Sequence, residues 1–254
     1  MIIKSKRLNN FKSISHGFFN KVGGKSEGIY QSLNCGLGSK DRKIDVKKNL
    51  EIVKNKFSKN SKNIFLLHQV HSSKVVYISK NFNFNKKIIK ADAIVTSQKK
   101  LPIAILTADC VPILICDNSS KIIAAIHAGW KGAYKNIISK VIKLMIKKGS
   151  QNKNIYAAIG PSISQKSYNV GEDFLRKFLK KNQKNNIFFK RRKNQIYFDL
   201  AKYVKSQLKF NKISNIDHIN IDTFDAKNNF FSARRSLKLK HDDYGRNISI
   251  IMIN

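Results

Sequence analysis

Residues 101–129, LPIAILTADCVPILICDNSSKIIAAIHAG, contain three apolar runs separated by short polar breaks. A fourth run, AIVTS at 93–97, lies just before them. The runs are rich in Ile, Val, Leu and Ala and have the length of β-strands, a pattern typical of strands in a buried sheet. This stretch therefore predicts a β core in the middle of the chain.

Helical spacing replaces strand spacing after Gly132. Apolar residues recur at i, i+3 and i+4 from Tyr134 to Met145, and Gly149 marks a helix stop. Asp199 stands where it can cap a later helix. Similar patterns predict further elements: helices at 171–181 and 198–210, and strands at 154–160, 218–224, 230–235 and 247–253. Together these elements indicate a mixed α/β protein with many strands.

The 254 residues include only three prolines and no internal repeat or Pro-rich linker, so residues 1–254 are predicted to form a single domain. No apolar run approaches the roughly 18 residues that a membrane-spanning helix needs, and the first residues lack the apolar stretch of a signal peptide. The three cysteines, Cys35, Cys110 and Cys116, form no CxxC motif, which disfavours a disulfide scaffold. We expect a soluble, cytoplasmic protein with no membrane partner.

The formal net charge of +35 has two interpretations. Taken alone it suggests a nucleic acid or an anionic surface as partner. However, Lys, Asn and Ile are abundant throughout while arginine is sparse, as expected of a genome rich in A and T. Because phosphate recognition usually gathers arginine as well as lysine, the compositional interpretation is favoured and no specific nucleic-acid partner is expected. The basic cluster at 188–195 is predicted to be a solvated loop.

Three side chains that suit a metal follow or end predicted strands: His68 or His71, then Cys110, then His127. Imidazole and thiolate are ligands that zinc prefers, and three protein ligands leave a fourth position open for catalysis. Residues three apart on an extended strand point to opposite faces, so only one of His68 and His71 is expected to reach the metal. Two alternatives remain open, namely a buried core cysteine and a metal-free Cys–His nucleophile pair.

Several motifs indicate a small-molecule site. The glycines around HAGWKG and IGPS can expose backbone N–H groups to an anion, and the glycines of residues 23–38 permit close backbone approach. Arg234, Arg235 and Arg246 lie near the C-terminus, where they could clamp a phosphate or form ordinary surface ion pairs.

The order of the motifs resembles that of one known family. The matching segments are HGFFNKVGGKSEGIYQSLNCGLG, LHQVHSSKV, ADAIVT, TADCVPIL, AAIHAGWKG, AAIGPSIS and FFSARR followed by GR, from His16 to the C-terminus. They resemble the YfiH family, whose members are also called laccase-domain or polyphenol oxidase proteins and purine nucleoside phosphorylases. The resemblance implies a single α/β domain, of the mixed α+β kind, with a layered β-sheet core flanked by helices.

The same resemblance implies a metal site, usually of zinc, formed by His71, Cys110 and His127. It implies phosphorolysis of adenosine, inosine and methylthioadenosine, with adenosine deamination beside it, so purine nucleoside and phosphate are the expected partners of a monomer or small homo-oligomer. The candidate substrate contacts are five residues of the matching motifs: Asn34, Asp109, Gly160, Arg234 and Arg235. Copper is an alternative metal, but phenol oxidation fits less well because a multicopper centre requires many histidines.

Three positions depart from the family pattern. Lys21 stands where an arginine is usual, Leu50 replaces the arginine of an Asn-Arg pair, and Asp222 occupies the position of a frequent cysteine. The first two changes remove guanidinium groups and so affect the expected anion binding. None of the three alters the proposed metal ligands.

Overall fold

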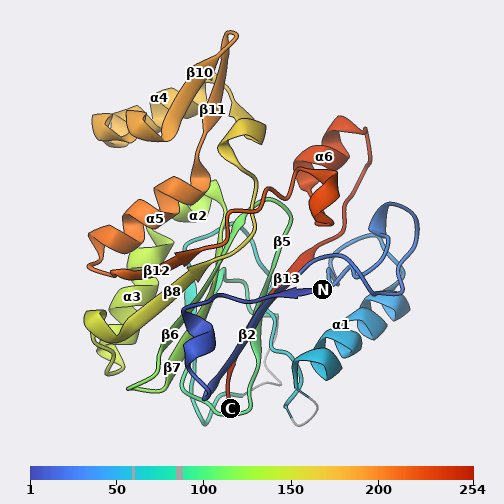
Figure 1. Cartoon of the computed structure of the whole chain (residues 1–254), viewed down its shortest axis with the longest axis vertical. Helices are drawn as coiled ribbons and strands as arrows, with labels where there is room; N and C mark the ends of the chain where they lie inside the picture. Colours follow the sequence, from blue (N-terminus) through green and yellow to red (C-terminus); the bar gives the residue numbers. More distant parts are fainter. Residues whose placement is uncertain (59–60, 84–87) are drawn as a thin grey trace.

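The computed structural model describes residues 1–58, 61–83 and 88–254. Its largest sheet has the strand order β12-β8-β6-β7-β4-β3 (Figure 1). The strands are β3 (Val75–Ile78), β4 (Ala93–Thr96), β6 (Val111–Asp117), β7 (Ile122–Ala128), β8 (Ile155–Ile159) and β12 (Asn215–His218). The pairs β3–β4 and β12–β8 are parallel and the other pairs are antiparallel, so the sheet is mixed.

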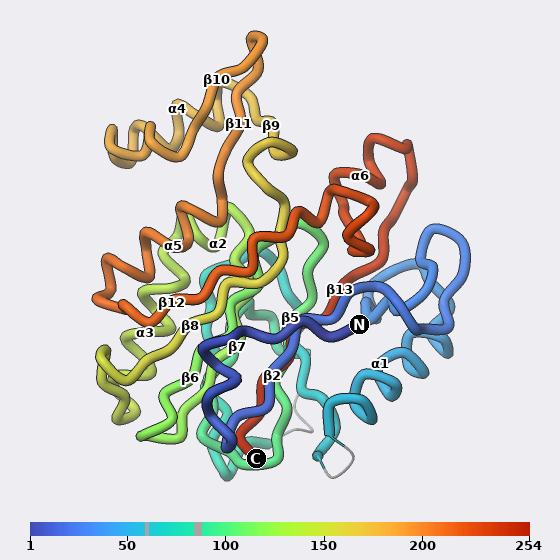
Figure 2. Tube along the Cα trace, viewed as in Figure 1, coloured from blue at the N-terminus to red at the C-terminus, as the bar shows by residue number. Residues whose placement is uncertain are grey.

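A second sheet of order β1-β2-β13-β5 pairs a strand from the first part of the chain, β2, with the last strand, β13, and the two run side by side in Figure 2. It contains β1 (Ile2–Ile3), β2 (Ile14–Phe19), β5 (Ile103–Thr107) and β13 (Asn247–Ile253). A small third sheet of order β10-β11-β9 consists of β9 (Asn169–Val170), β10 (Phe189–Arg192) and β11 (Gln195–Phe198). In Figure 1 this sheet and α4 stand apart from the two larger sheets.

The helices are α1 (Lys43–Phe57), α2 (Trp130–Tyr134), α3 (Ile137–Lys147), α4 (Glu172–Lys181), α5 (Leu200–Phe210) and α6 (Ala233–Lys238). The apolar faces of α3 and α5 share one core cluster with the large sheet. The opposite face of that sheet packs on the second sheet, and α1 covers the far side of the second sheet. The fold is thus the layered, mixed α/β arrangement that the resemblance implies.

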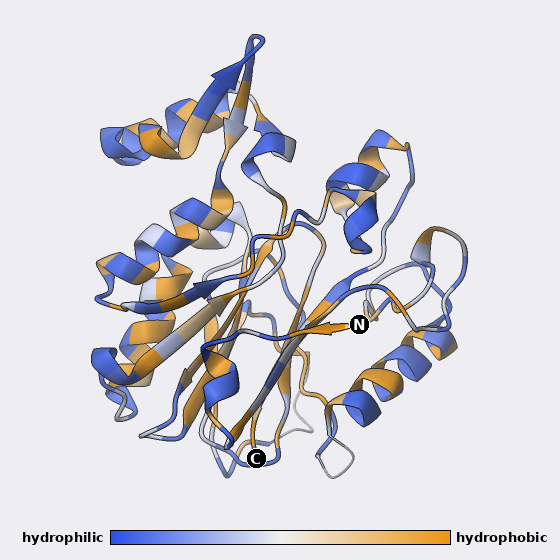
Figure 3. Cartoon of the chain, viewed as in Figure 1, coloured by the Kyte–Doolittle hydropathy of each residue, from blue (hydrophilic) through white to orange (hydrophobic). Residues whose placement is uncertain are grey.

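Burial on both faces explains the continuous apolar runs. In β6, Ile113 and Ile115 pack toward the helices, whereas Leu114 and Cys116 pack toward the second sheet. Hydropathy colouring shows the same apolar strands in the interior, with blue residues concentrated on the outer faces of the helices (Figure 3). Among the described residues, no helix combines the length and apolar character that crossing a bilayer requires.

Most predicted elements are confirmed. The runs at 93–97, 101–107, 111–117 and 121–129 contain β4 to β7, and Asp199 caps α5 by accepting a hydrogen bond from the Lys202 N–H at 2.8 Å. The helix predicted from Tyr134 is divided into α2 and α3, because Asn136 adopts a left-handed conformation with φ of 60°. Gly149, with φ of 107°, follows α3 as expected.

Three predictions were wrong. Residues 230–235 form no strand, because Ser232 caps α6 and so starts a helix after the two phenylalanines. The strand expected at 218–224 lies earlier, at β12, and ends at His218. Residues 188–195 are mostly exposed, as expected of a solvated segment, but they are not a loop: they carry β10, which pairs with β11 and places Phe189 opposite Phe198.

Candidate metal centre

His71, Cys110 and His127 converge, with potential ligand atoms that all lie within 4.8 Å of one another. His71 lies in the loop before β3, Cys110 directly precedes β6, and His127 is the penultimate residue of β7. The antiparallel pairing of β6 with β7 places the start of one strand beside the end of the other, which brings Cys110 to His127. This is the three-ligand set that the family resemblance implies, and its occupation by a metal is a proposal.

Asp92 organises this cluster from behind. Its fully buried carboxylate accepts hydrogen bonds from the backbone N–H groups of His71 (3.0 Å) and Ser72 (2.6 Å) and lies 2.8 Å from His127 Nδ1. Because an ionised carboxylate only accepts, His127 Nδ1 must carry a proton, which leaves Nε2 as its ligand atom. Such a carboxylate–histidine pair fixes both the tautomer and the ring orientation of a metal ligand.

The ionisable groups of the cluster shift one another's pKa values. Burial would raise the pKa of Asp92, but hydrogen bonds from His127 and Ser72 lower it to about 2. Burial would likewise raise the pKa of Cys110, yet the neighbouring His127 and His71 lower it. The pKa of His127 is in turn raised by Cys110 and Asp92, against the effect of burial. Thiolate is therefore the favoured form of Cys110, and thiolate is the form that binds metals.

The strand argument about His68 and His71 was wrong in its premise. Residues 68–72 form a loop in which His71 has φ of 55°, so alternation along a strand does not apply. The Gln69 side-chain amide anchors this loop, since it donates to the Leu106 carbonyl and accepts from the Leu106 N–H, both at 2.7 Å. His71 reaches the cluster, while His68 lines the adjoining cavity.

Gly129 has a packing role. A Cβ at this position would lie 2.8 Å from His71 Nδ1, closer than real Cβ atoms come, and 3.0 Å from Cys110 Sγ, tighter than most such contacts. Glycine at position 129 therefore leaves room for the side chains of His71 and Cys110 to meet. The anion site suggested by HAGWKG has no comparable support, because α2 is only five residues long.

A cavity of about 550 Å³ opens beside the cluster, within the usual size range of small-molecule sites. One part of its lining is apolar and the rest carries the histidines, Cys110, an amide, a phenol and a guanidinium. The lining residues are Leu37, Gly38, Leu66, Leu67, His68, Gln69, His71, Ile88, Ile89, Leu106, Thr107, Ala108, Cys110, His127, Tyr244 and Arg246.

The five candidate substrate contacts do not line this cavity. Asp109, only 8% exposed, accepts hydrogen bonds from the Thr223 hydroxyl (2.7 Å), the Ser232 hydroxyl (2.9 Å) and the Arg234 N–H (2.7 Å). Its carboxylate thereby holds the start of α6 against the β5–β6 turn. Asp109 thus supports the local framework, and its role as a substrate contact stays a prediction.

Arg234 and Arg235 also have protein partners. The Arg234 guanidinium donates to the Asn169 carbonyl at 2.9 Å, and that of Arg235 donates to the carbonyls of Thr223, Phe224 and Phe230. Neither residue lines the cavity, and the phosphate clamp suggested for the pair stays a prediction.

Asn34 and Gly160 are buried in the framework. The Asn34 amide donates to Ser39 Oγ and Asp41 Oδ2 and accepts from two backbone N–H groups. A Cβ at Gly160 would lie 2.2 Å from the Phe18 ring, so this glycine is required by packing.

Sequence reasoning did not assign roles to Asp92, Gln69 or the cavity position of Arg246. A signal existed for Asp92, since it is the one charged residue in the otherwise apolar start of ADAIVT. The three family departures, Lys21, Leu50 and Asp222, are absent from the described cavity lining.

Comparisons with known proteins agree with this arrangement. The model of the family described as multi-copper polyphenol oxidoreductase laccase matches residues 15–254. A purine nucleoside phosphorylase of Rickettsia prowazekii is 33% identical over 244 residues, covering 95% of this chain and 97% of the relative. A purine nucleoside phosphorylase of Bacteroides thetaiotaomicron is 33% identical over 274 residues, covering 100% and 98%.

Solved structures show the same fold. A DUF152-family protein of Neisseria meningitidis superposes with a TM-score of 0.87 at 27% identity, covering 100% of this chain and 99% of that protein. YfiH of Bacillus licheniformis superposes with a TM-score of 0.86 at 26% identity, covering 95% and 93%. With the matching family model and this whole-chain similarity, the chain belongs to the laccase-domain family that includes YfiH.

Proposed function

We propose that this chain is a zinc-dependent purine nucleoside phosphorylase that converts adenosine, inosine or methylthioadenosine and phosphate into the free base and a sugar 1-phosphate. The observation that carries the proposal is the His71, Cys110 and His127 cluster, set in the wall of a cavity of about 550 Å³. The names of the curated relatives support the reaction class.

The donor set fits zinc. Two imidazoles and a thiolate match the ligand types of zinc sites, and three ligands leave a fourth position open. Copper also accepts these donors, but a multicopper centre would need more ligands than the three that gather in the described part of the chain. When bound, the metal supplies a Lewis acid that polarises a substrate atom. Adenosine deamination in the same cavity is the second activity we propose.

The protein's own residues would bind and orient the nucleoside. Leu66, Leu67, Ile89 and Leu106 form an apolar wall suited to a purine ring. The same wall limits water around the reacting bond, which strengthens polar interactions there. Asp92, through its contact with His127, would keep the ligand cluster in one geometry during turnover.

The test is product identification with matched cysteine variants. Zinc-loaded protein is incubated with adenosine and phosphate, and adenine, inosine and hypoxanthine are separated by chromatography. We expect adenine from phosphorolysis and inosine from deamination, and we expect Cys110→Ala to lose both products together with the metal. Cys116→Ala removes a fully buried thiol outside the cluster and should keep both. Failure of the wild type to consume any nucleoside would refute the proposal, as would full activity of Cys110→Ala.

One alternative has an observation in its favour. The lowered pKa of Cys110 also suits a metal-free Cys–His hydrolase or deamidase, in which the thiolate is the nucleophile. Elemental analysis separates the two readings: zinc at about one ion per chain, lost on His127→Ala substitution, argues for the metal enzyme. Phenol oxidation is tested by offering the copper-loaded protein a phenolic substrate.

A further inference from the structure

Arg246 differs from the other C-terminal arginines in lining the cavity beside the ligand cluster. Among the described lining residues it is the single Lys or Arg side chain. It projects from the segment before β13, next to Tyr244, and faces the segment around Leu37 and Gly38, which lines the same rim. The rim therefore joins two parts of the chain that are about two hundred residues apart.

The backbone of Arg246 is fixed by the N-terminal segment. Asn34 Oδ1 accepts the N–H groups of both Arg246 (2.9 Å) and Gly36 (3.0 Å), and Cys35 N–H donates to the Arg246 carbonyl at 3.1 Å. A Cβ on Gly36 would lie 2.6 Å from Arg246 Cδ, so this glycine is needed to let the arginine stem pass. Asn34 is thus a positioning residue for Arg246.

The guanidinium is oriented but not saturated. Nη1 donates to the Tyr244 carbonyl at 3.0 Å, Nη2 lies 3.4 Å from Asp243 Oδ1, and the group stands 4.8 Å from the centre of the Tyr244 ring. An arginine has five N–H donors, and the contacts described for Arg246 use two. By contrast, Arg235 donates to three backbone carbonyls.

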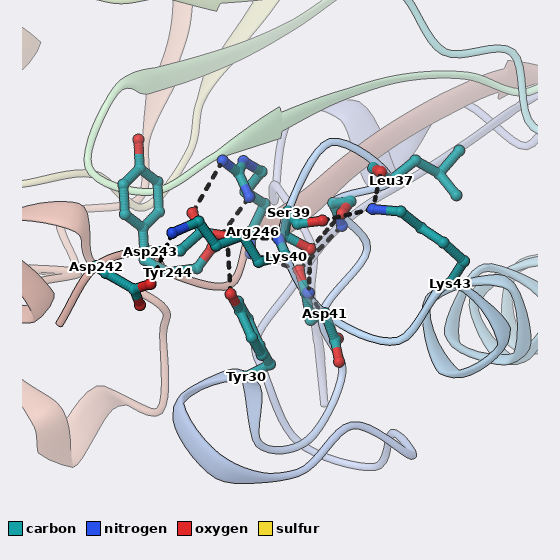
Figure 4. A network of polar contacts seen from close by, with 12 residues as sticks. Tyr30, Leu37, Ser39, Lys40, Asp41, Lys43, Asp242, Asp243, Tyr244 and Arg246 are labelled. Carbon is teal, nitrogen blue, oxygen red and sulfur yellow. Dashed lines mark hydrogen bonds and ion pairs between the residues drawn. The ribbon is translucent and has the colours of Figure 1, made fainter.

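Asp243 is held by other partners, as Figure 4 shows. Its Oδ2 accepts from the Tyr30 hydroxyl at 2.9 Å and from the Lys40 N–H at 2.8 Å. The long 3.4 Å contact from its other oxygen to Arg246 is a weak ion pair. Arg246 consequently keeps much of its capacity to bind a second anion.

We propose that Arg246 binds the phosphate co-substrate in the cavity, with Asn34 and Asp243 as its positioning residues. The inference rests on the proposed function, because phosphorolysis requires a phosphate beside the nucleoside. A planar guanidinium with free N–H donors matches two phosphate oxygens, which a lysine ammonium cannot do in the same geometry. Of the three C-terminal arginines that could clamp a phosphate, Arg246 is the one that lines the cavity.

The test measures binding of inorganic phosphate by titration calorimetry at constant ionic strength, with zinc-loaded protein. Arg246→Gln should raise the dissociation constant at least tenfold, and Arg246→Lys should lie between it and the wild type. Arg176→Gln removes an exposed charge of α4 that is paired with Asp173, and it should bind as the wild type does. Equal zinc content and thermal midpoints will show that Arg246→Gln is folded.

Kinetics then separate this inference from the proposed function. If the wild type turns over nucleosides, Arg246→Gln should raise the KM for phosphate far more than the KM for the nucleoside. If the wild type binds phosphate through Arg246 but consumes no nucleoside, the proposed reaction fails and the anion site stands. Unchanged phosphate binding in Arg246→Gln, or no phosphate binding by the wild type, would overturn the inference.

Discussion

Replacing Asp92 by Asn should weaken metal binding, although Asp92 is not itself a proposed ligand. The substitution keeps the shape of the side chain but turns one acceptor oxygen into an NH₂ donor. If that donor faces His127, the imidazole can accept its hydrogen bond only when Nδ1 carries no proton. The proton then lies on Nε2, which can no longer bind the metal. If the donor faces Ser72 instead, it meets the N–H and hydroxyl donors of that residue.

The substitution should lower both the metal affinity and the stability of the protein. Loss of an outer-shell carboxylate typically lowers metal affinity by about 10- to 100-fold. Loss of charge-assisted hydrogen bonds at this fully buried position should also lower the free energy of unfolding of the metal-free protein by about 2–4 kcal/mol. Zinc affinity is measured by competition with a chromophoric chelator, and stability by urea unfolding in the presence of EDTA.

Asp222→Asn is the matched control. Asp222 also accepts several hydrogen bonds, from Ser164, Ser167 and Phe224, and none of these described donors is a histidine. The Asp222→Asn variant should lose stability, as Asp92→Asn does, but its zinc affinity should equal that of the wild type. Equal zinc affinity of the two variants would refute the argument that Asp92 sets the tautomer of His127.

Three further changes have expected outcomes. Gly129→Ala should lower zinc affinity about tenfold, because its Cβ would displace His71, whereas Gly171→Ala, with open space around its Cβ, should not; equal affinities would contradict this. Gln69→Ala removes both hydrogen bonds from the side-chain amide to Leu106 of β5. It should speed up backbone amide hydrogen exchange in the loop before β3 without unfolding the sheets; unchanged exchange would contradict this. Burial, with a smaller effect of a nearby lysine, lowers the pKa of His16 from 6.5 to about 4, so the unfolded chain binds more protons between these values and stability falls as the pH falls. Between pH 7 and pH 4.5, the free energy of unfolding of His16→Gln should therefore fall by about 2–3 kcal/mol less than that of the wild type, measured by urea unfolding. Equal decreases would refute the lowered pKa of His16.

The strands were predictable because burial on both sides leaves an unbroken apolar run in the sequence. That signal does not say which sheet a strand joins. β5 and β6 are separated by only three residues, yet β5 pairs with β13 and β6 pairs with β7 and β8. The choice depends on partners at the far end of the chain. The strand predicted at 230–235 failed for a local reason, since the cap formed by Ser232 outweighed the two apolar residues before it.

The metal ligands were predictable because cysteine and histidine carry their chemistry in any context, and few other residues share it. The polar residues around them were harder to interpret, because Asn34, Asp109 and Arg235 have the same side chains whether they face a substrate or satisfy a buried backbone. Asn34 accepts a hydrogen bond from a residue 212 positions away, and Asp109 from one 125 positions away. Which role each residue has depends on contacts between segments that come together only in the folded chain. The folded arrangement also makes Arg246, one of three arginines near the C-terminus, the cation that lines the cavity.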